Sequence, residues 1–233
     1  MRVLAGTSGF SYKEWRGSFY PEDVSANDVL RVYAERLPAV EINNTFYRMP
    51  RESVVEGWAA QVPDDFRFSI KATRRITHIK RLKGVEEEVG YLLNALQMLG
   101  PKLGIVLFQL PPNFKADPDV LDAFLQLLPP GAPAAFEFRH ESWDDDAIRA
   151  RLAQAGATLC QADVDDAPEP ELFPTTERGY VRLRRAQYDR EALARWVDRV
   201  RSQPWKDAYV FFKHEDEGVG PALAQSFLEL WNG

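Results

Sequence analysis

Hydrophobic residues along this chain recur in short runs rich in β-forming side chains, and longer amphipathic stretches separate most of these runs. A short apolar run bounded by turn residues is typical of a buried strand, whereas apolar residues every three or four positions are typical of a helix. Eight runs qualify as strands, namely Val3–Ser8, Ala39–Asn43, Phe66–Lys71, Gly104–Leu110, Ala134–Phe138, Ala157–Ala162, Gly179–Arg184 and Ala208–Lys213. Strands that alternate with helices predict a parallel sheet, and eight of them predict an α/β fold closed into a TIM-type (β/α)8 barrel.

The segments between the strands carry signals for where helices begin and end. Asp117 before a proline, and Asp189 before an amphipathic stretch, are each expected to cap the start of a helix. Ser142 precedes an acidic turn that suits the positive end of a helix, and Gly156 is expected to end that helix. A further helix is predicted over 85–99, where leucine and valine recur on one face.

One connection lacks these signals. Residues 164–178 hold three prolines and no helical periodicity, so we expect the sixth helix to be reduced or missing. The chain shows no linker, repeat or low-complexity tract, which favours a single domain over 1–233. An open doubly wound sheet is the alternative, but the segment after the first strand lacks the G-x-G-x-x-G spacing of a dinucleotide site.

Strand alternation decides which polar residues enter the barrel. Alternate residues of a barrel strand point into the lumen, and the others pack against the helices. In the second run Val40 and Ile42 suit the helix side, which turns Glu41 and Asn43 inward. The same rule turns further polar side chains inward: Ser8, Ser69, Lys71, Gln109, Glu137, Arg139, Gln161, Asp163, Tyr180, Arg182 and Arg184.

The inward set mixes carboxylates with cations. Burying an unpaired carboxylate costs several kcal/mol, so we expect Glu41 and Glu137 to be neutralised by the Lys and Arg side chains that share the lumen. Most members of the set stand at the carboxyl end of their strand, which is the face where barrel enzymes carry their active sites. A purely structural ionic layer is the alternative, above all for Glu137 and Arg182, which we expect to lie deeper.

Five motifs in the first two thirds of the chain resemble one family. They are GTSGFSYKEWRGSFYP (6–21), VEINNTFYRMP (40–50), FRFSIKATRRITHIKRL (66–82), LGIVLFQLPPNF (103–114) and FEFRHESW (136–143). In this order they resemble the family catalogued as domain of unknown function 72, also called YecE-like. The resemblance implies a TIM-type barrel, in agreement with the strand count, and it implies no reaction.

The last third of the chain departs from that family pattern. The seventh strand of such proteins tends to read Tyr-x-Arg-x-His-Gly, but Arg184 and Arg185 stand here in place of the His and Gly. The eighth strand tends to end Phe-Asn-Asn, but Lys213 and His214 follow the phenylalanine here. These changes make the predicted mouth of the barrel more basic and put in doubt any role that the family assigns to those positions.

Composition narrows the classes of function. The chain has 233 residues, a net charge of −6 and one cysteine, Cys160, which we interpret as a small buried hydrophobic residue. An acidic chain disfavours generic, charge-driven binding to nucleic acid. With no apolar run long enough for a membrane span, no secretory signal pattern and no cysteine pair, we expect a protein of the reduced cytoplasm without membrane partners.

Metal and cofactor chemistry has little support in the sequence. The three histidines, His78, His140 and His214, show no metal-ligand spacing, so no cofactor is expected. One hard cation such as Mg²⁺, held by carboxylates, stays open as an alternative; those carboxylates are Glu41, Glu137 and Asp163. A glycosidase pair made of Glu41 and Glu137 is disfavoured, because neighbouring cations lower a carboxyl pKa.

Anion binding fits the pattern best. The loop after the third strand adds more positive charge, with Arg74, Arg75, Lys80, Arg81 and Lys83. Gly218–Pro221 opens the last predicted helix, and free backbone N–H groups at a helix start suit phosphate. We therefore expect an enzyme, either a hydrolase or a lyase, that acts on a phosphorylated or other anionic substrate.

Each residue of the expected site has a predicted role, with Glu41 as the main proton-transfer group. The expected catalytic residues are Glu41, Lys71 and Glu137, and the expected substrate-binding residues are Asn43, Gln109, Arg139, Arg182, Arg184 and Lys213. A nucleic-acid-binding or nucleic-acid-processing barrel is the second hypothesis, similar to endonuclease IV in architecture but without its full metal-ligand set. It would use the 74–83 loop and nearby aromatic rings, most of which we expect to form a small core beneath the first two loops.

Overall fold

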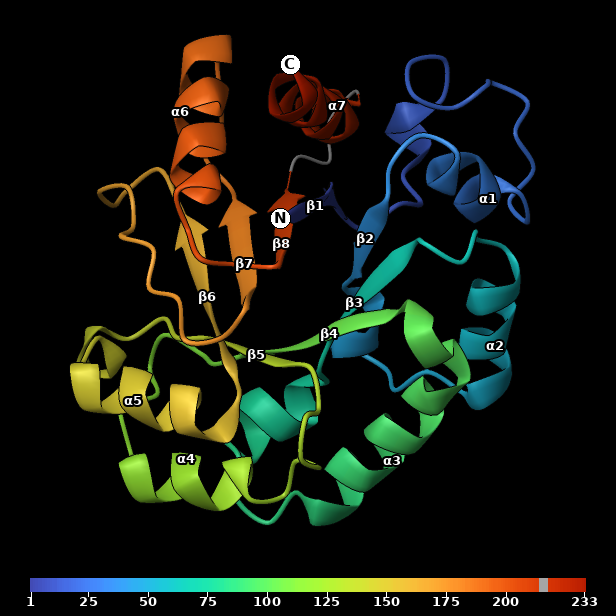
Figure 1. Ribbon diagram of the computed structural model, residues 1–233. Coiled ribbons are helices and arrows are strands. Elements are labelled where there is room, and N and C mark those ends of the chain that lie inside the picture. The colour runs from blue at the N-terminus through green and yellow to red at the C-terminus, as the bar shows by residue number, and fades with distance from the viewer. Residues whose placement is uncertain (214–217) are drawn as a thin grey trace.

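Eight parallel strands close into one barrel, and helices cover its outside (Figure 1). The computed structural model describes residues 1–213 and 218–233. The strands are β1 (Arg2–Ser8), β2 (Ala39–Ile42), β3 (Arg67–Lys71), β4 (Leu103–Gln109), β5 (Ala134–Glu137), β6 (Thr158–Asp163), β7 (Arg178–Leu183) and β8 (Asp207–Phe212). Each strand pairs with its neighbours in chain order and β8 pairs with β1, which confirms the TIM-type prediction.

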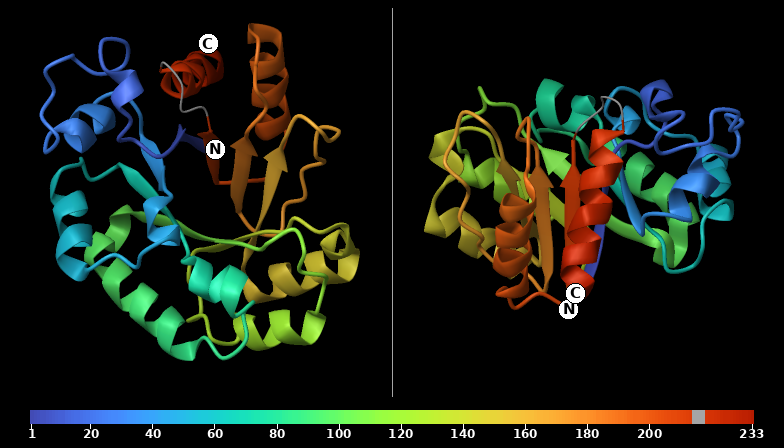
Figure 2. Two further views of the ribbon diagram at one scale, coloured as in Figure 1. Left: turned by 180° about the vertical axis from the view of Figure 1, so that it is seen from behind. Right: turned by 90° about the horizontal axis from the view of Figure 1, so that it is seen from above.

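Seven α-helices lie outside the strands in the part of the chain that is described. They are α1 (Val29–Ala34), α2 (Glu52–Ala60), α3 (Glu86–Leu96), α4 (Pro118–Leu125), α5 (Asp146–Ala155), α6 (Arg190–Arg201) and α7 (Val219–Asn232). One helix follows every strand except β6. Residues 164–177, all of them described, run from β6 to β7 without a helix, as the three prolines predicted. Both chain termini lie at one end of the barrel (Figure 2, right).

Most of the predicted helix ends are confirmed, and one is wrong. The side chains of Asp117 and Asp189 cap α4 and α6, and Gly156 ends α5 with a φ of 69°. The cap of α5 is Asp145 rather than Ser142, and the helix begins only at Asp146. The reason is a separate 3-10 turn over Glu141–Trp143, which the side chain of His140 caps by accepting from the Ser142 N–H (3.1 Å).

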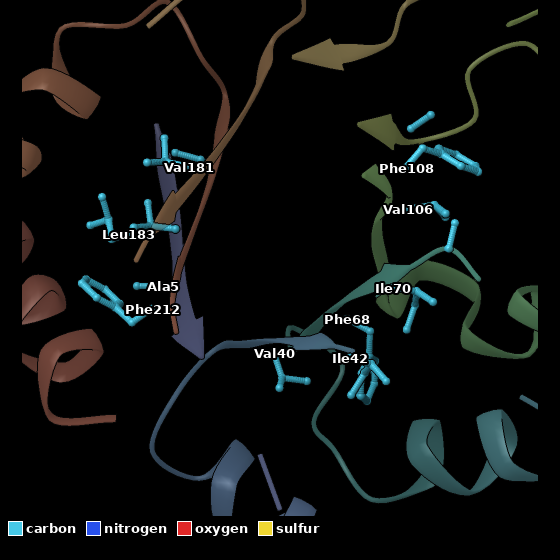
Figure 3. Packing of buried hydrophobic residues seen from close by; sticks show 14 of the residues in the cluster. Ala5, Val40, Ile42, Phe68, Ile70, Val106, Phe108, Val181, Leu183 and Phe212 are labelled. Carbon is cyan, nitrogen blue, oxygen red and sulfur yellow. The ribbon is translucent and has the colours of Figure 1, made fainter. Parts of the chain in front are cut away.

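Hydrophobic side chains on the outer face of the strands hold the helices on the barrel. Figure 3 shows members of this set, including Val40, Ile42, Phe68, Ile70, Val181 and Leu183, which the alternation rule assigned to the helix side. The lower part of the lumen holds a second, smaller apolar cluster made of Leu4, Ala39, Ile105, Leu107, Ala135, Cys160, Tyr180, Tyr209 and Phe211. Cys160 is buried there, as predicted. No helix among the described residues is both long and apolar enough to cross a membrane.

Candidate functional site

A buried ion triad lies in the lumen above the apolar cluster. Arg182 of β7 reaches across the barrel to two carboxylates, with 2.8 Å from Nη2 to Glu41 Oε1 and 2.6 Å from Nη1 to Glu137 Oε2. None of the three side chains is more than 2% exposed. Alternation in β2, β5 and β7 turns all three inward, so the predicted neutralisation of Glu41 and Glu137 by a lumen cation is present.

Glu41 is saturated with hydrogen-bond donors. Besides Arg182, its carboxylate accepts from Tyr180 OH (2.6 Å), Ser8 Oγ (2.7 Å) and Asn43 Nδ2 (3.0 Å). Burial alone would raise the pKa of Glu41, but Arg182 and these donors outweigh burial and lower it. A carboxylate held in this way suits a permanent anion better than a group that exchanges protons near neutral pH.

Glu137 connects the triad to the mouth of the barrel. It accepts from Gln109 Nε2 (2.8 Å) and Arg139 Nε (3.0 Å), and Arg184 Nη1 lies 3.9 Å away. Burial raises the pKa of Glu137, but Arg182 and Arg139 lower it well below its usual range. Arg139 and Arg184 are partly exposed, at 32% and 20% of their side chains, so they lead from the buried triad to solvent.

Lys71 is a lumen cation with no carboxylate partner among the described residues. It ends β3, and its Nζ lies 4.3 Å from the centre of the Phe46 ring, in a cation–π contact. Its side chain has no ion pair with any residue in 1–213 or 218–233. Burial and the nearby charge of Arg182 lower the pKa of Lys71 to about 8, so both its charged and neutral forms are accessible close to physiological pH.

His78 lies near the cations at the mouth of the barrel, and their charges act on its pKa. This histidine packs edge-on against Phe46 and shares a hydrogen bond with Thr77 Oγ1 (2.8 Å). Burial and, to a smaller extent, the charges of Lys71 and Arg139 together lower the pKa of His78 to about 4. The nearby cations thus act on the pKa of His78 in the same direction as burial.

Much of the basic loop after β3 is neutralised by its own surroundings. Glu88 of α3 accepts from Arg75 (2.6 Å) and lies 2.8 Å from Lys80 Nζ, and these cations lower the pKa of Glu88 to about 2. Lys83 lies 3.4 Å from Asp117. Three of the five cations that the sequence placed on this loop therefore have a carboxylate partner, and those three share two carboxylates. The aromatic core predicted beneath the first loops is also present, since Trp15, Phe19 and Tyr20 are buried.

Two residues predicted to face the lumen face outward instead. In β6 it is Cys160 that enters the lumen cluster, so the alternation is opposite to the prediction and Gln161 and Asp163 lie on the outer side. Asp163 accepts from Arg185 Nε (2.7 Å) and Tyr188 OH (2.8 Å). Residues 157–162 hold two polar residues, Thr158 and Gln161, which alternation assigns to opposite faces, so the sequence left the facing of this strand undetermined.

Because Asp163 faces outward, the three carboxylates considered for Mg²⁺, Glu41, Glu137 and Asp163, do not lie together. Glu41 and Glu137 lie on either side of Arg182, and Asp163 is on the far side of β6. Among the described residues, no group of three or more His, Cys, Asp or Glu side chains could hold a metal ion. Arg185, which replaces the family glycine, is the ion-pair partner of Asp163.

The last predicted anion contacts lie around β8. Lys213 is exposed just after this strand, and its backbone N–H donates to the Leu183 carbonyl (3.2 Å). His214 lies outside the described residues. Gly218 adopts a left-handed φ of 81° at the start of α7, as a loop-to-helix turn requires. Among the described residues, no hydrogen bond or ion pair joins the start of α7 to Glu41, Glu137 or Arg182.

The structure adds a cavity that sequence reasoning missed. It has a volume of about 850 Å³ and lies beside β5 and β6, against α5 and the segment 164–177. Glu137, Arg139 and Arg184 line its inner end, so it adjoins the mouth. The signal for it in the sequence was the absent sixth helix, since a barrel strand without its covering helix leaves space on the outer face.

Comparison with known proteins agrees with the fold. The family model described as "Protein of unknown function DUF72" matches residues 4–233. The chain is 36% identical over 156 residues to the UPF0759 protein YecE of Escherichia coli K12, covering 64% of this chain and 56% of that protein. It is 30% identical over 135 residues to UPF0759 protein YunF of Bacillus subtilis, covering 54% and 48%. The chain thus spans about half the length of these curated relatives.

Solved structures extend the similarity over the whole barrel. A DUF72 family protein from Thermotoga maritima superposes with a TM-score of 0.79 at 26% identity, covering all of both chains. One from Enterococcus faecalis superposes with a TM-score of 0.81 at 22% identity, covering 99% of this chain and 96% of that one. None of these descriptions names a substrate or a reaction.

Proposed function

Because the chain belongs to the DUF72 family, whose description names no reaction, we propose a function from its own site: an enzyme that binds a phosphorylated or other anionic substrate at the barrel mouth. Lys71 is the proton-transfer group in this proposal. Arg139 and Arg184 hold the anion, and Asn43 and Gln109 fix the geometry of the two carboxylates. Arg182, Glu41 and Glu137 form the fixed floor of the site.

The observation that carries the proposal is the excess of cations at the mouth. Two carboxylates, Glu41 and Glu137, face Arg182, Arg139 and Arg184, and Lys71 has no carboxylate partner in the part of the chain that is described. A bound anion would offset the remaining positive charge, which is costly in a partly buried site. Its position at the carboxyl ends of the strands is where barrel enzymes bind substrates.

We assign proton transfer to Lys71 because, of Lys71, Glu41 and Glu137, it has the pKa closest to 7. A general acid or base works best when its pKa is near the working pH. Lys71, at about 8, meets this condition, whereas cations hold the pKa values of Glu41 and Glu137 below their usual range. The role first predicted for Glu41 therefore passes to Lys71 in this proposal.

Nucleic acid is the competing ligand. Its support in the sequence was the 74–83 loop and the aromatic rings near it. The loop cations Arg75, Lys80 and Lys83 have carboxylate partners. Three rings of the first loop, Trp15, Phe19 and Tyr20, are buried, whereas Tyr47 is exposed. These contacts favour a small anion in the mouth over a strand that follows a basic surface.

Calorimetric titration with inorganic phosphate, followed by a panel of phosphorylated metabolites, tests the proposal. We expect phosphate to bind the wild type, and the double variant Lys71→Met with Arg139→Ala to weaken binding by at least roughly tenfold, since each lost charged hydrogen bond is worth about 1.5–3 kcal/mol. Lys206→Met is the matched control, because Lys206 pairs with Glu177 at the other end of the barrel. Its affinity should equal that of the wild type.

Affinity should also fall as pH rises through about 8, the pKa of Lys71, because the anion prefers the protonated amine. The Lys71→Met variant should lose this step. Equal affinity in the wild type and the double variant would contradict the proposal. A single-stranded oligonucleotide titrated across salt concentrations separates the alternative, since a steep salt dependence together with no phosphate binding would favour nucleic acid.

A further inference from the structure

The barrel has one incomplete seam, between β5 and β6. These strands pair at only two positions, Ala135 with Thr158 and Phe136 with Leu159, whereas β7 and β8 pair at six. Elsewhere backbone hydrogen bonds continue past the paired positions, as from the Leu110 N–H to the Glu137 carbonyl between β4 and β5. No such bond joins β5 to β6 within the described residues, so the upper edge of β6 is open.

The cavity of about 850 Å³ follows this open edge. Consecutive strand residues point to opposite faces of a sheet, yet all four residues from Leu159 to Ala162 line the cavity. A space that runs along the open edge of β6 accounts for contact with all four residues. Because Glu137 and Arg184 line the same cavity, the space continues from the mouth of the barrel, through the seam, to the outside of β6.

Fixed walls surround the space. On one side, the rings of Phe138 and Trp143 stack at 4.5 Å, and Trp143 Nε1 donates to the Phe114 carbonyl (2.7 Å). On another side, the guanidinium of Arg149 lies 4.2 Å from the Phe173 ring centre, and Arg149 is itself bound to Asp144 (2.6 Å). These contacts stabilise the cavity without a helix after β6.

Gln161 ties the connecting segment to the strand. In the orientation of its side-chain amide that satisfies both neighbours, Gln161 donates to the Leu159 carbonyl (3.1 Å) and accepts from the Phe173 N–H (2.7 Å). The wall that carries Phe173 is therefore bonded to β6. The outward facing of Gln161, which the sequence did not predict, is what allows this bond.

The chemistry of the lining changes from the inner end to the rim. Arg139 and Arg184 stand at the inner end, and Arg184 Nε is buried with no hydrogen-bond partner among the described residues. The middle is apolar, with Phe138, Ile148, Leu159 and Phe173. The outer lining is acidic, with Asp165, Asp166 and Glu171. An acidic rim repels a second anionic group at the outer end.

Resting on the proposed function, we infer that the seam cavity is a second subsite, which binds an aromatic or similarly flat apolar part of the substrate whose anionic group lies in the mouth. The substrate class is then a small aromatic monoanion or monoester, not a sugar bisphosphate or a polyanionic strand. The volume is within the range of roughly 300–1,000 Å³ that small-molecule sites occupy, so there is room for more than one ring.

Calorimetric titration of methyl phosphate and phenyl phosphate tests the inference, because the two esters carry the same charged group and differ by the ring. We expect phenyl phosphate to bind the wild type at least about tenfold more tightly, as burial of a ring gives. Leu159→Trp places an indole ring in the apolar middle of the cavity, where the phenyl ring would lie, and should abolish this advantage while methyl phosphate binds as before. Leu127→Trp is the matched control, since Leu127 is half-buried and does not line the cavity.

Each outcome is informative. Equal binding of the two esters to the wild type, or a phenyl advantage that survives in Leu159→Trp, would overturn the inference and leave the proposed function standing. Failure of both esters and of inorganic phosphate to bind would overturn the proposed function itself. If circular dichroism shows that Leu159→Trp does not fold, Phe173→Ala replaces it, and removal of that wall should reduce the phenyl advantage several-fold without changing methyl phosphate binding.

Discussion

The lumen of this barrel has two layers that follow opposite rules. The lower layer is apolar and contains residues such as Leu107, Tyr209 and Phe211. The upper layer, toward the carboxyl ends of the strands, is the ion triad of Glu41, Glu137 and Arg182. Filling a lumen with apolar side chains stabilises a fold directly, whereas a buried ion triad must first overcome the desolvation of every charge. Under the function proposed above, the upper layer is the floor of the anion site.

Tyr180 belongs to both layers. Its ring packs beside Tyr209 and Phe211 in the apolar layer, and its hydroxyl donates to Glu41 (2.6 Å) and lies 2.6 Å from Ser69 Oγ. The change from one layer to the other therefore occurs along a single side chain. Substitutions in the two layers should differ in how much they lower the free energy of unfolding and in how that loss depends on pH.

The largest effect should come from Arg182→Met, which leaves Glu41 and Glu137 buried without their shared cation. We expect a loss of about 3–5 kcal/mol in the free energy of unfolding at pH 7, measured by urea denaturation. The loss should shrink on acidification, because the orphaned carboxylates have raised pKa values and become neutral. A loss that is the same at pH 7 and pH 5 would contradict the charge account.

Leu107→Ala in the lower layer should cost roughly 3 kcal/mol through loss of buried area and the cavity left behind. The titratable groups of this cluster, Cys160, Tyr180 and Tyr209, have pKa values raised by burial and stay neutral at both pH values. The cost relative to the wild type should therefore be the same at both. The wild type itself should lose stability as pH falls below about 4.5. The reason is that the native pKa values of Glu41 and Glu137 are lowered, so their stabilisation is present above the unfolded-state pKa and is lost below it.

Tyr180→Phe should have an intermediate effect, about 1–3 kcal/mol, since it removes one donor to Glu41 and leaves Ser69 without its hydroxyl partner. The ring stays in the apolar layer, so packing is preserved. Because one donor to the carboxylate is lost, the pKa of Glu41 should rise. The midpoint of acid unfolding, followed by near-ultraviolet circular dichroism, should move to higher pH; an unchanged midpoint would contradict a role of the Tyr180 hydroxyl in keeping Glu41 ionised.

The smallest effect should be a gain from Lys71→Met, on the order of 1 kcal/mol at pH 7, because a partly buried, unpaired charge is removed. The native pKa of Lys71, about 8, lies below its usual 10.5. Between these values the unfolded state binds more protons, so the wild type gains stability as pH rises relative to the variant. Urea unfolding at pH 7 and pH 9 should show the advantage of the variant shrinking, while Lys206→Met shows no such trend.

The sequence predicted the barrel well because its signals are local. Each strand was found within two residues, and alternation turned Glu41, Glu137 and Arg182 to the same side. The exception is β6, where the polar residues Thr158 and Gln161 fall on opposite faces, so the pattern does not fix the facing and that of Asp163 came out reversed. The cap of α5 failed for a similar reason, since two acceptors, Ser142 and Asp145, competed within one turn.

By itself, then, the sequence determined eight strands, a helix missing after the sixth, and a lumen in which carboxylates need cations. Only the tertiary structure decided that one arginine serves both carboxylates, that Lys71 has no carboxylate partner within the described residues, and that the seam between β5 and β6 opens into a cavity. The physical reason is range. Periodicity and caps act over a few neighbouring residues, whereas a contact such as Arg182 with Glu41 joins positions 141 residues apart and depends on how the whole barrel closes.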